Sequence, residues 1–136
     1  MIIRQFKIED IHKGLLETLQ SGFQINSITE DSITSWINNS NWMIVAEESG
    51  VIIGSCTLHL NYKLIHDGGI VGMIEDVVVR GEHRGKNIGT LMIQEALKLS
   101  KELGCYKVIL SCFRDKVEFY TKCGFREEAV TMRFDI

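Results

Sequence analysis

An apolar strand, a basic turn and an amphipathic helix follow one another without interruption in the middle of the chain. Val71–Val79 is rich in β-branched residues, which predicts a strand that is buried on both faces. In Ile88–Leu103, apolar residues recur every three or four positions, which predicts a long helix with one buried face. Since the helix follows the strand after a short turn, the chain is restricted to α/β architectures.

The remaining patterns predict further strands and helices on both sides of this unit. Apolar alternation predicts strands at Ile2–Phe6, Trp42–Glu47, Val51–Asn61, Tyr106–Cys112 and Glu128–Phe134, and apolar stripes predict helices at Asp10–Ser21, Thr29–Asn38 and Asp115–Lys122. Thr29 is the expected N-cap of its helix, and Trp36 lies on that helix's apolar stripe. The Ser49–Gly50 turn joins two of the strands into a hairpin. This order of elements predicts a mixed sheet with helices packed on it.

The size and composition of the chain limit the classes of protein to consider. With 136 residues, the chain is long enough for one hydrophobic core, so we expect a single domain over residues 1–136. The formal net charge of −3 does not provide the basic surface that nucleic-acid binders use. The sequence shows neither the ~20 apolar residues of a membrane span nor the zones of a signal peptide, so we expect no membrane partner and a cytoplasmic location. The four cysteines form no C-x-x-C pair, and no metal site is expected.

The turn Arg84–Gly89 has the composition of an anion-binding site. Glycines allow successive backbone N–H groups to converge on one point, and the N-terminus of the following helix adds unpaired donors and a positive dipole end. Arg84 and Lys86 add positive charge, and the turn lacks the fingerprints of a P-loop or a dinucleotide-binding fold. The alternative is a tight strand-to-helix turn with solvated charges, and the turn alone does not decide between the two.

The same turn resembles the acyl-CoA-binding turn of the GNAT acetyltransferase superfamily. That motif has Gln or Arg, two variable residues, Gly or Ala, one variable residue, and Gly or Ala; here Asn87 replaces the first small residue. Asn tolerates left-handed backbone, so the turn is compatible with this replacement. The resemblance implies the GNAT fold, with a mixed, mostly antiparallel central sheet flanked by helices, and acetyl-CoA as co-substrate. The implied acetyl-CoA-binding residues are Val77, Val78, Val79, Arg84, Gly85, Lys86, Asn87, Ile88, Gly89, Thr90, Ser111, Lys116 and Tyr120.

Within that superfamily, residues 61 to 132 most resemble the glucosamine-6-phosphate N-acetyltransferases. The resemblance rests on the string Lys63–His66 together with Gly72–Val79, and on the strings Gly104–Leu110 and Val117–Phe125. It implies a homodimer in which both subunits line the pocket for an amino-sugar phosphate. The implied substrate-binding residues are Lys63, Leu64, Ile65, His66, Glu75, Asp76, Tyr106, Lys107 and Arg133. Basic side chains would neutralise the phosphate, and carboxylates would accept hydrogen bonds from sugar hydroxyls and the amine.

Acetyl transfer to an amine requires an acid for the leaving thiolate and a route for the amine proton. The resemblance implies Tyr120 as the general acid, with Glu75 and Asp76 as the other catalytic residues. The family commonly has an acidic residue where this chain has Ser111, which is too weak a base to take the amine proton directly. The proton therefore leaves through water held by Glu75 or in bulk solvent before binding, and the sequence does not distinguish these routes.

Two other functions are compatible with the same acetyl-CoA site. In the first alternative, the enzyme acetylates a different small amine or a protein amine. In the second alternative, the domain binds CoA without catalysing a reaction. The second alternative follows from Ser111 and from Lys116, which stands where many members of the superfamily have an asparagine that contacts CoA.

Overall fold

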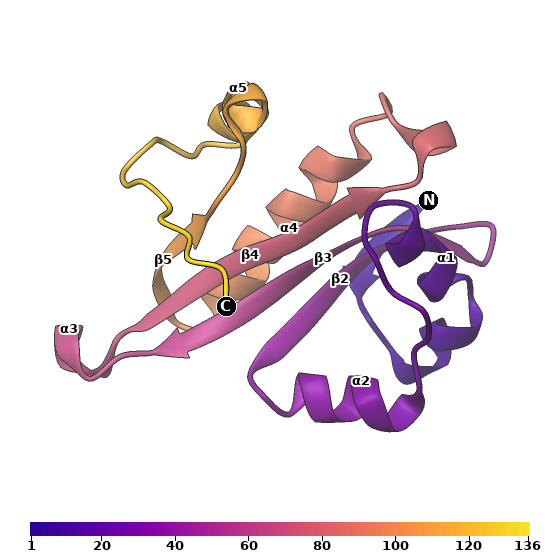
Figure 1. Ribbon diagram of the computed structural model, residues 1–136, viewed down its shortest axis with the longest axis horizontal. Helices are drawn as coiled ribbons and strands as arrows, with labels where there is room; N and C mark the ends of the chain where they lie inside the picture. Colours follow the sequence, from indigo (N-terminus) through magenta and orange to yellow (C-terminus); the bar gives the residue numbers. More distant parts are fainter.

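The chain forms one five-stranded sheet in which strands that are consecutive in sequence are also neighbours in space (Figure 1). The computed structural model describes residues 1–136. The strands are β1 (Ile2–Gln5), β2 (Asn41–Glu48), β3 (Val51–Tyr62), β4 (Ile70–Val79) and β5 (Cys105–Leu110). Strands β1 to β4 pair with one another in antiparallel fashion, and β5 runs parallel to β4. This is the mixed, mostly antiparallel sheet that the sequence predicted.

Five helical segments and three short 3-10 segments lie between the strands or after the last one. The helices are α1 (Leu15–Gln20), α2 (Glu30–Ile37), α3 (Ile65–Gly68), α4 (Ile88–Glu102) and α5 (Val117–Lys122), and the 3-10 segments are η1 (Ile8–His12), η2 (Gly81–His83) and η3 (Arg114–Lys116). Segment α3 is not a regular helix, because His66 and Asp67 have left-handed φ angles of 55° and 54°. None of the helices combines the length and the apolar character that crossing a membrane requires.

The two faces of the sheet are covered by different helices because side chains alternate along each strand. Ile44 and Ala46 of β2 lie in the core cluster that contains the buried face of α4. Their neighbours Met43 and Val45 point to the other face, where they join Leu15 of α1 in a second cluster that also includes α2. The sheet is therefore enclosed by α4 on one side and by α1 and α2 on the other, as Figure 1 shows.

Local sequence signals predicted most ends of helices and strands correctly. Thr29 caps α2 by accepting a hydrogen bond from the Ser32 N–H, as its position before the apolar stripe predicted. The β2–β3 hairpin turns at Ser49 and Gly50, whose φ angles of 51° and 78° are both left-handed. The helix expected over Asp10–Ser21 is interrupted, because Gly14 has a left-handed φ of 83° and separates η1 from α1.

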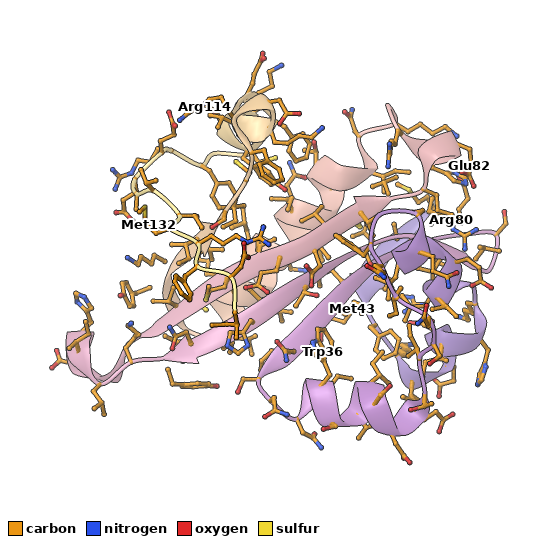
Figure 2. All side chains as sticks on the ribbon, in the orientation of Figure 1. Trp36, Met43, Arg80, Glu82, Arg114 and Met132 are labelled. Atoms are coloured by element: carbon orange, nitrogen blue, oxygen red, sulfur yellow. The ribbon has the colours of Figure 1, made fainter.

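The strand predicted at Glu128–Phe134 is wrong. Residues 123–136 contain no strand or helix, and the last apolar residues of this tail are more than four-fifths exposed. These are Val130, Met132 (Figure 2), Phe134 and Ile136. A strand needs a neighbour for its backbone hydrogen bonds, and no strand of this chain pairs with the tail. Strand β5 is also shorter than predicted, since it ends at Leu110 rather than at Cys112.

Candidate active site

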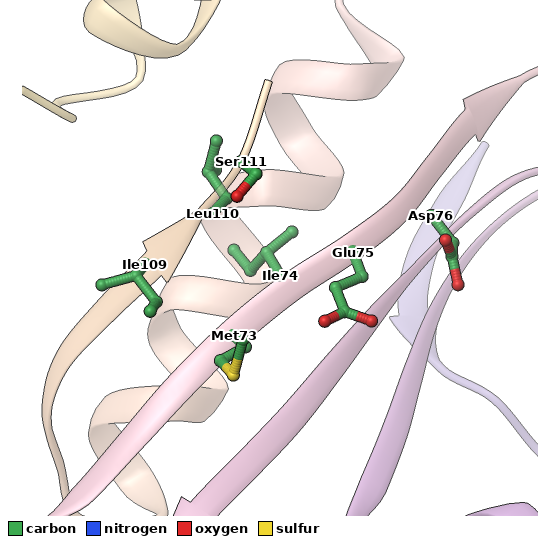
Figure 3. Close-up of a pocket in the computed structure, with 7 residues that line it drawn as sticks. All are labelled: Met73, Ile74, Glu75, Asp76, Ile109, Leu110 and Ser111. Atoms are coloured by element: carbon green, nitrogen blue, oxygen red, sulfur yellow. The ribbon is translucent and has the colours of Figure 1, made fainter. Parts of the chain in front are cut away.

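Strands β4 and β5 separate partway along their length and leave a cavity between them (Figure 3). Their parallel pairing runs from Ile70 opposite Cys105 to Ile74 opposite Leu110 and stops there. The cavity measures about 290 Å³ and is lined by Met73, Ile74, Glu75, Asp76, Ile109, Leu110 and Ser111. Beyond Ile74, the edge of β4 that faces β5 has no strand partner, so its backbone polar groups are available to a ligand.

A β-bulge in β4 presents the two acidic residues at this cavity. Thr57 of β3 pairs with Glu75 and Ser55 pairs with Val78, so Asp76 and Val77 together oppose a single residue. Asp76 takes up the bulge with a left-handed φ of 52°. Both carboxylates are exposed, and neither takes part in any ion pair of the structure.

The strand Val71–Val79 was expected to be buried on both faces. The bulge corrects that expectation for Glu75 and Asp76, because it turns both side chains out of the core, whereas Ile74 and Val78 remain buried. The acids therefore carry no burial penalty in this chain.

The predicted anion-binding turn has the required backbone geometry. Gly85 and Asn87 have left-handed φ angles of 79° and 61°. The first backbone hydrogen bond of α4 runs from the Leu91 N–H to the Asn87 carbonyl, so the N–H groups of residues 88–90 have no partner inside the helix. Arg84 and Lys86 are exposed beside the turn, and Arg84 Nε lies 3.2 Å from the Val79 carbonyl. The turn thus combines free donors, a helix N-terminus and two positive charges.

Helix α5 lies against the start of α4 and presents Tyr120 to the core. A Cβ atom on Gly89 would lie 3.3 Å from Phe119 Cζ, so only glycine permits this close approach without a shift. The Tyr120 ring packs edge-on against Phe119, with ring centroids 4.9 Å apart, and against Phe125 at 6.0 Å. Partial burial raises the pKa of the Tyr120 hydroxyl, and nearby thiols, that of Cys112 first, raise it further. The phenol therefore keeps its proton at neutral pH.

The other two implied acetyl-CoA residues, Ser111 and Lys116, follow the end of β5 and are exposed. Ser111 lines the cavity, and its hydroxyl lies 2.7 Å from the hydroxyl of Thr131 in the C-terminal tail. Lys116 is exposed at the N-terminus of α5.

The structure does not bring the basic substrate residues to the carboxylates within one chain. Lys63 to His66 form the β3–β4 turn, where Leu64 and Ile65 are largely exposed. The His66 ring lies 5.0 Å from that of Tyr106, and Lys107 Nζ lies 5.8 Å from the Tyr106 ring. Five residues of β4, roughly 17 Å of strand, separate this cluster from Glu75.

Arg133 was expected on a terminal strand, facing the substrate. It lies instead on the irregular tail, exposed and paired with Asp135, with 2.7 Å between Nε and Oδ1. The expected strand is therefore wrong at this position, and the role of Arg133 in substrate binding stays a prediction.

A second cavity next to Asp76 was not predicted. It measures about 350 Å³, and its walls come from α1, α2, the loop between them and the neighbouring strands. Its lining includes Leu19, Phe23, Ile28, Trp36, Met43, Thr57 and Asp76. The apolar stripe of α2 identified Trp36 as inward-facing, but no local signal shows that this face lies beside an acidic residue 40 positions later.

Comparison with known proteins agrees with this architecture. The model of the acetyltransferase (GNAT) family matches residues 8–125. Over 136 residues, the chain is 32% identical to a glucosamine 6-phosphate N-acetyltransferase of Candida albicans, covering 95% of this chain and 91% of that protein. A protein of the same name from Dictyostelium discoideum is 34% identical, with 95% and 87% covered.

Solved structures give the same result. The crystal structure of glucosamine-6-phosphate N-acetyltransferase from Arabidopsis thaliana superposes with a TM-score of 0.89 at 30% identity, covering 98% of this chain and 97% of that one. Sequence and structure thus agree over nearly the full length of the chain. The chain belongs to the acetyltransferase (GNAT) family and, within it, to the glucosamine 6-phosphate N-acetyltransferases.

Proposed function

We propose that this protein transfers the acetyl group of acetyl-CoA to the amine of glucosamine 6-phosphate, which gives N-acetylglucosamine 6-phosphate. The observation that carries the proposal is the junction of the β4–β5 cavity with the bulge at Asp76, since it offers free backbone donors and two unpaired carboxylates at one point. The relatives that share the name glucosamine 6-phosphate N-acetyltransferase support this choice of acceptor.

In the proposed mechanism, both substrates are bound together and the amine attacks the thioester directly. The turn Arg84–Gly89 and the first N–H groups of α4 hold the pyrophosphate of CoA. Backbone N–H groups at the bulge, next to Val77 and Val78, donate to the oxygen that becomes negative when the carbonyl is attacked. Because these donors are fixed by the sheet, they require no rearrangement during the reaction.

Two protons must move for the reaction to be complete. Asp76 accepts a hydrogen bond from the amine and orients it, and Glu75 holds a water molecule that takes up the amine proton. Tyr120 donates its phenolic proton to the thiolate of CoA as the carbon–sulfur bond breaks. The raised pKa of Tyr120 supports this role, because the group must be protonated before the thiolate leaves.

The proposal includes a homodimer in which the partner supplies the phosphate-binding cations. Within one chain, Lys63, His66 and Lys107 lie too far from Glu75 to reach the same small substrate. The segments beside them also carry exposed apolar side chains, which a partner would cover. These are Tyr62, Leu64, Ile65, Tyr106, Val130, Met132 and Phe134.

Release of free CoA, followed with a thiol reagent, tests the function. We expect rapid release with acetyl-CoA and glucosamine 6-phosphate and slow release with glucosamine, because the phosphate contributes binding energy. Tyr120→Phe should lower kcat by about 100-fold and change the two KM values little, since the lost proton transfer occurs only in the transition state. Absence of CoA release with the sugar phosphate would refute the acceptor, and a Tyr120→Phe enzyme of normal kcat would refute the role of the phenol.

A further inference from the structure

His59 of β3 lies beside the proposed site of acetyl transfer but has no role in the mechanism described above. It pairs with Asn41 of β2 on one side and with Met73 of β4 on the other. Directly opposite residues share a face and side chains alternate along a strand, so His59 lies on the same face of the sheet as Met73 and Glu75. Both of those residues line the β4–β5 cavity (Figure 3). The half-buried imidazole is therefore next to the wall of that cavity.

The hydrogen bonds of Asn41 fix the tautomer of the His59 ring. Asn41 Nδ2 donates to the carbonyl of Trp36 near the end of α2 at 2.8 Å, and Asn41 Oδ1 therefore faces His59 Nδ1, at 2.9 Å. An amide oxygen only accepts hydrogen bonds, so the neutral ring carries its proton on Nδ1 and its lone pair on Nε2.

The lone pair on His59 Nε2 is free to accept a proton. Nε2 forms no hydrogen bond with another residue, and His59 belongs to no ion pair. The one buried side-chain nitrogen or oxygen without a partner in this structure belongs to His83, so the unpartnered Nε2 of His59 is open to solvent. Water can therefore reach it from the side of the cavity wall.

Glu75 is the one charged side chain among the cross-strand neighbours of His59. Since Thr57 pairs with Glu75 and His59 pairs with Met73, Glu75 is diagonal to His59. Diagonal positions are roughly 7–8 Å apart, within reach of long side chains, so one water can bond to both the carboxylate and Nε2. The other neighbours on this face are uncharged; they are Asn41, Met43, Thr57, Asn61, Val71 and Met73.

The elements beyond these strands add little charge near His59. The end of α2 and the residues after it, from Trp36 to Asn39, carry no charge. The one charged residue of β5 is Lys107, which pairs with Val71. Protonation of His59 is therefore coupled most directly to Glu75 and to the polar contact with Asn41.

We propose that His59 is the final acceptor of the amine proton, which it receives through the water held by Glu75. This inference rests on the proposed function and supplies the base that Ser111 does not provide. As the amine nitrogen bonds to the thioester carbon, its proton passes to the water, and the water passes one of its own protons to Nε2. The carbon–sulfur bond breaks as Tyr120 protonates the thiolate. The imidazolium then releases its proton to solvent, and Tyr120 regains one from solvent.

The dependence of kcat on pH tests this role, with CoA release from acetyl-CoA and glucosamine 6-phosphate as the assay. His59→Asn keeps a donor for Asn41 but cannot accept a proton. It should lower kcat at pH 8 by about tenfold, because the water can then release its proton only to solvent. KM for acetyl-CoA should change less than about twofold, which shows that the site is still folded. His12→Asn on the exposed segment η1 is the control and should leave kcat unchanged.

Asn41→Asp distinguishes proton acceptance from a structural role. An imidazolium cannot accept the proton, so kcat should fall as the pH is lowered and His59 becomes charged. A carboxylate at position 41 favours the imidazolium, so the pH at which kcat falls should rise by about one unit. The double variant of His59→Asn and Asn41→Asp should show no such rise, because its residue 59 does not titrate.

These results distinguish this inference from the proposed function. If the wild type acetylates the sugar phosphate and His59→Asn has a normal kcat, the role of His59 is refuted and the acceptor stands. The role is also refuted if Asn41→Asp leaves the pH profile in place, or if its displacement persists in the double variant. If the wild type does not acetylate the sugar phosphate, the proposed function fails together with the proton route that depends on it.

Discussion

At the scale of single residues, the backbone conformation of the phosphate-binding turn depends on Gly85. Its φ of 79° is unfavourable for other residues, although a Cβ atom there would meet no atom within 4 Å. Gly85→Ala should therefore act on the backbone alone and raise KM for acetyl-CoA about five- to thirtyfold, which corresponds to the ~1–2 kcal/mol cost of left-handed backbone. Gly81→Ala is the control, because Gly81 has equal space and no positive φ. If both variants leave KM unchanged, the turn does not hold the cofactor.

A buried carboxylate near the N-terminus predicts how stability depends on pH. Burial raises the pKa of Asp10, but hydrogen bonds from the Arg4 guanidinium and the Lys7 N–H outweigh burial and lower this pKa from 3.8 to about 2. A lowered pKa in the folded state gives stability that is present above pH 4 and is lost as pH falls from about 4 to about 2. We expect this loss to be about 2 kcal/mol of unfolding free energy, measured by urea denaturation at several pH values.

Asp10→Asn should remove that pH dependence and lower the free energy of unfolding at pH 7 by about 3 kcal/mol, because Arg4 then loses its buried partner. Glu118→Gln is the control, since the pair between Glu118 and Lys122 is exposed and should contribute less than about 0.5 kcal/mol. An Asp10→Asn protein that keeps the full acid-induced loss would contradict the assignment.

At the scale of elements, Arg80 attaches α1 to the end of β4 (Figure 2). Its Nε donates to Thr18 Oγ1 at 2.8 Å, and its Nη2 donates to the Gly14 carbonyl at 2.7 Å. The buried Thr18 hydroxyl in turn donates to the Ile52 carbonyl of β3 at 2.6 Å. These hydrogen bonds hold α1 in place. Because α1 leads into the loop over the second cavity, they also fix the cavity wall that includes Phe23.

Thr18→Val should lower the free energy of unfolding by about 1–3 kcal/mol, because the Ile52 carbonyl and Arg80 Nε then lose their buried partner. Arg80→Met should be similar, and the double variant should cost less than the sum of the two, since both remove the same contact. Urea denaturation measures all three. Thr34→Val on the exposed face of α2 is the control, with an expected change within about 0.5 kcal/mol. Strictly additive costs would show that the two residues act independently.

At the scale of the whole molecule, the exposed tail and the separated substrate residues both predict a dimer in solution. Sedimentation should give twice the chain mass, and Met132→Asp with Phe134→Asp should shift it to the monomer, because charge disfavours burial of the tail. A wild-type protein that stays monomeric at micromolar concentration would exclude the shared pocket.

Mixed dimers test the shared pocket directly. A Lys63→Glu chain and a Tyr120→Phe chain should each be nearly inactive, because each dimer carries the same defect at both sites. Refolding an equal mixture should restore roughly a quarter of wild-type activity, since half of the dimers are mixed and one site in each has both residues intact. If activity does not recover, Lys63 and Tyr120 either act in the same subunit's site or do not both belong to a site.

The sequence by itself determined the local units. The apolar periods of β4 and α4, the Thr29 cap and the Ser49–Gly50 turn are signals between residues that are near in sequence, and they placed these elements correctly. The basic glycine turn and the strings around Asp76 and Tyr120 were sufficient to identify the acetyltransferase family. Such features are readable because local conformation is governed by near neighbours.

Only the tertiary structure decided the features that depend on how strands pair and elements pack. The bulge at Asp76 arises from its register with β3, the β4–β5 cavity arises where pairing ends at Ile74, and the second cavity joins α2 to a residue 40 positions later. The tail at Val130–Phe134 alternates like a strand but has no partner in this chain, so its pattern predicted the wrong conformation. A two-residue alternation of apolar side chains indicates which side chains could share a face. The segment becomes a strand only when a neighbouring backbone accepts and donates its hydrogen bonds.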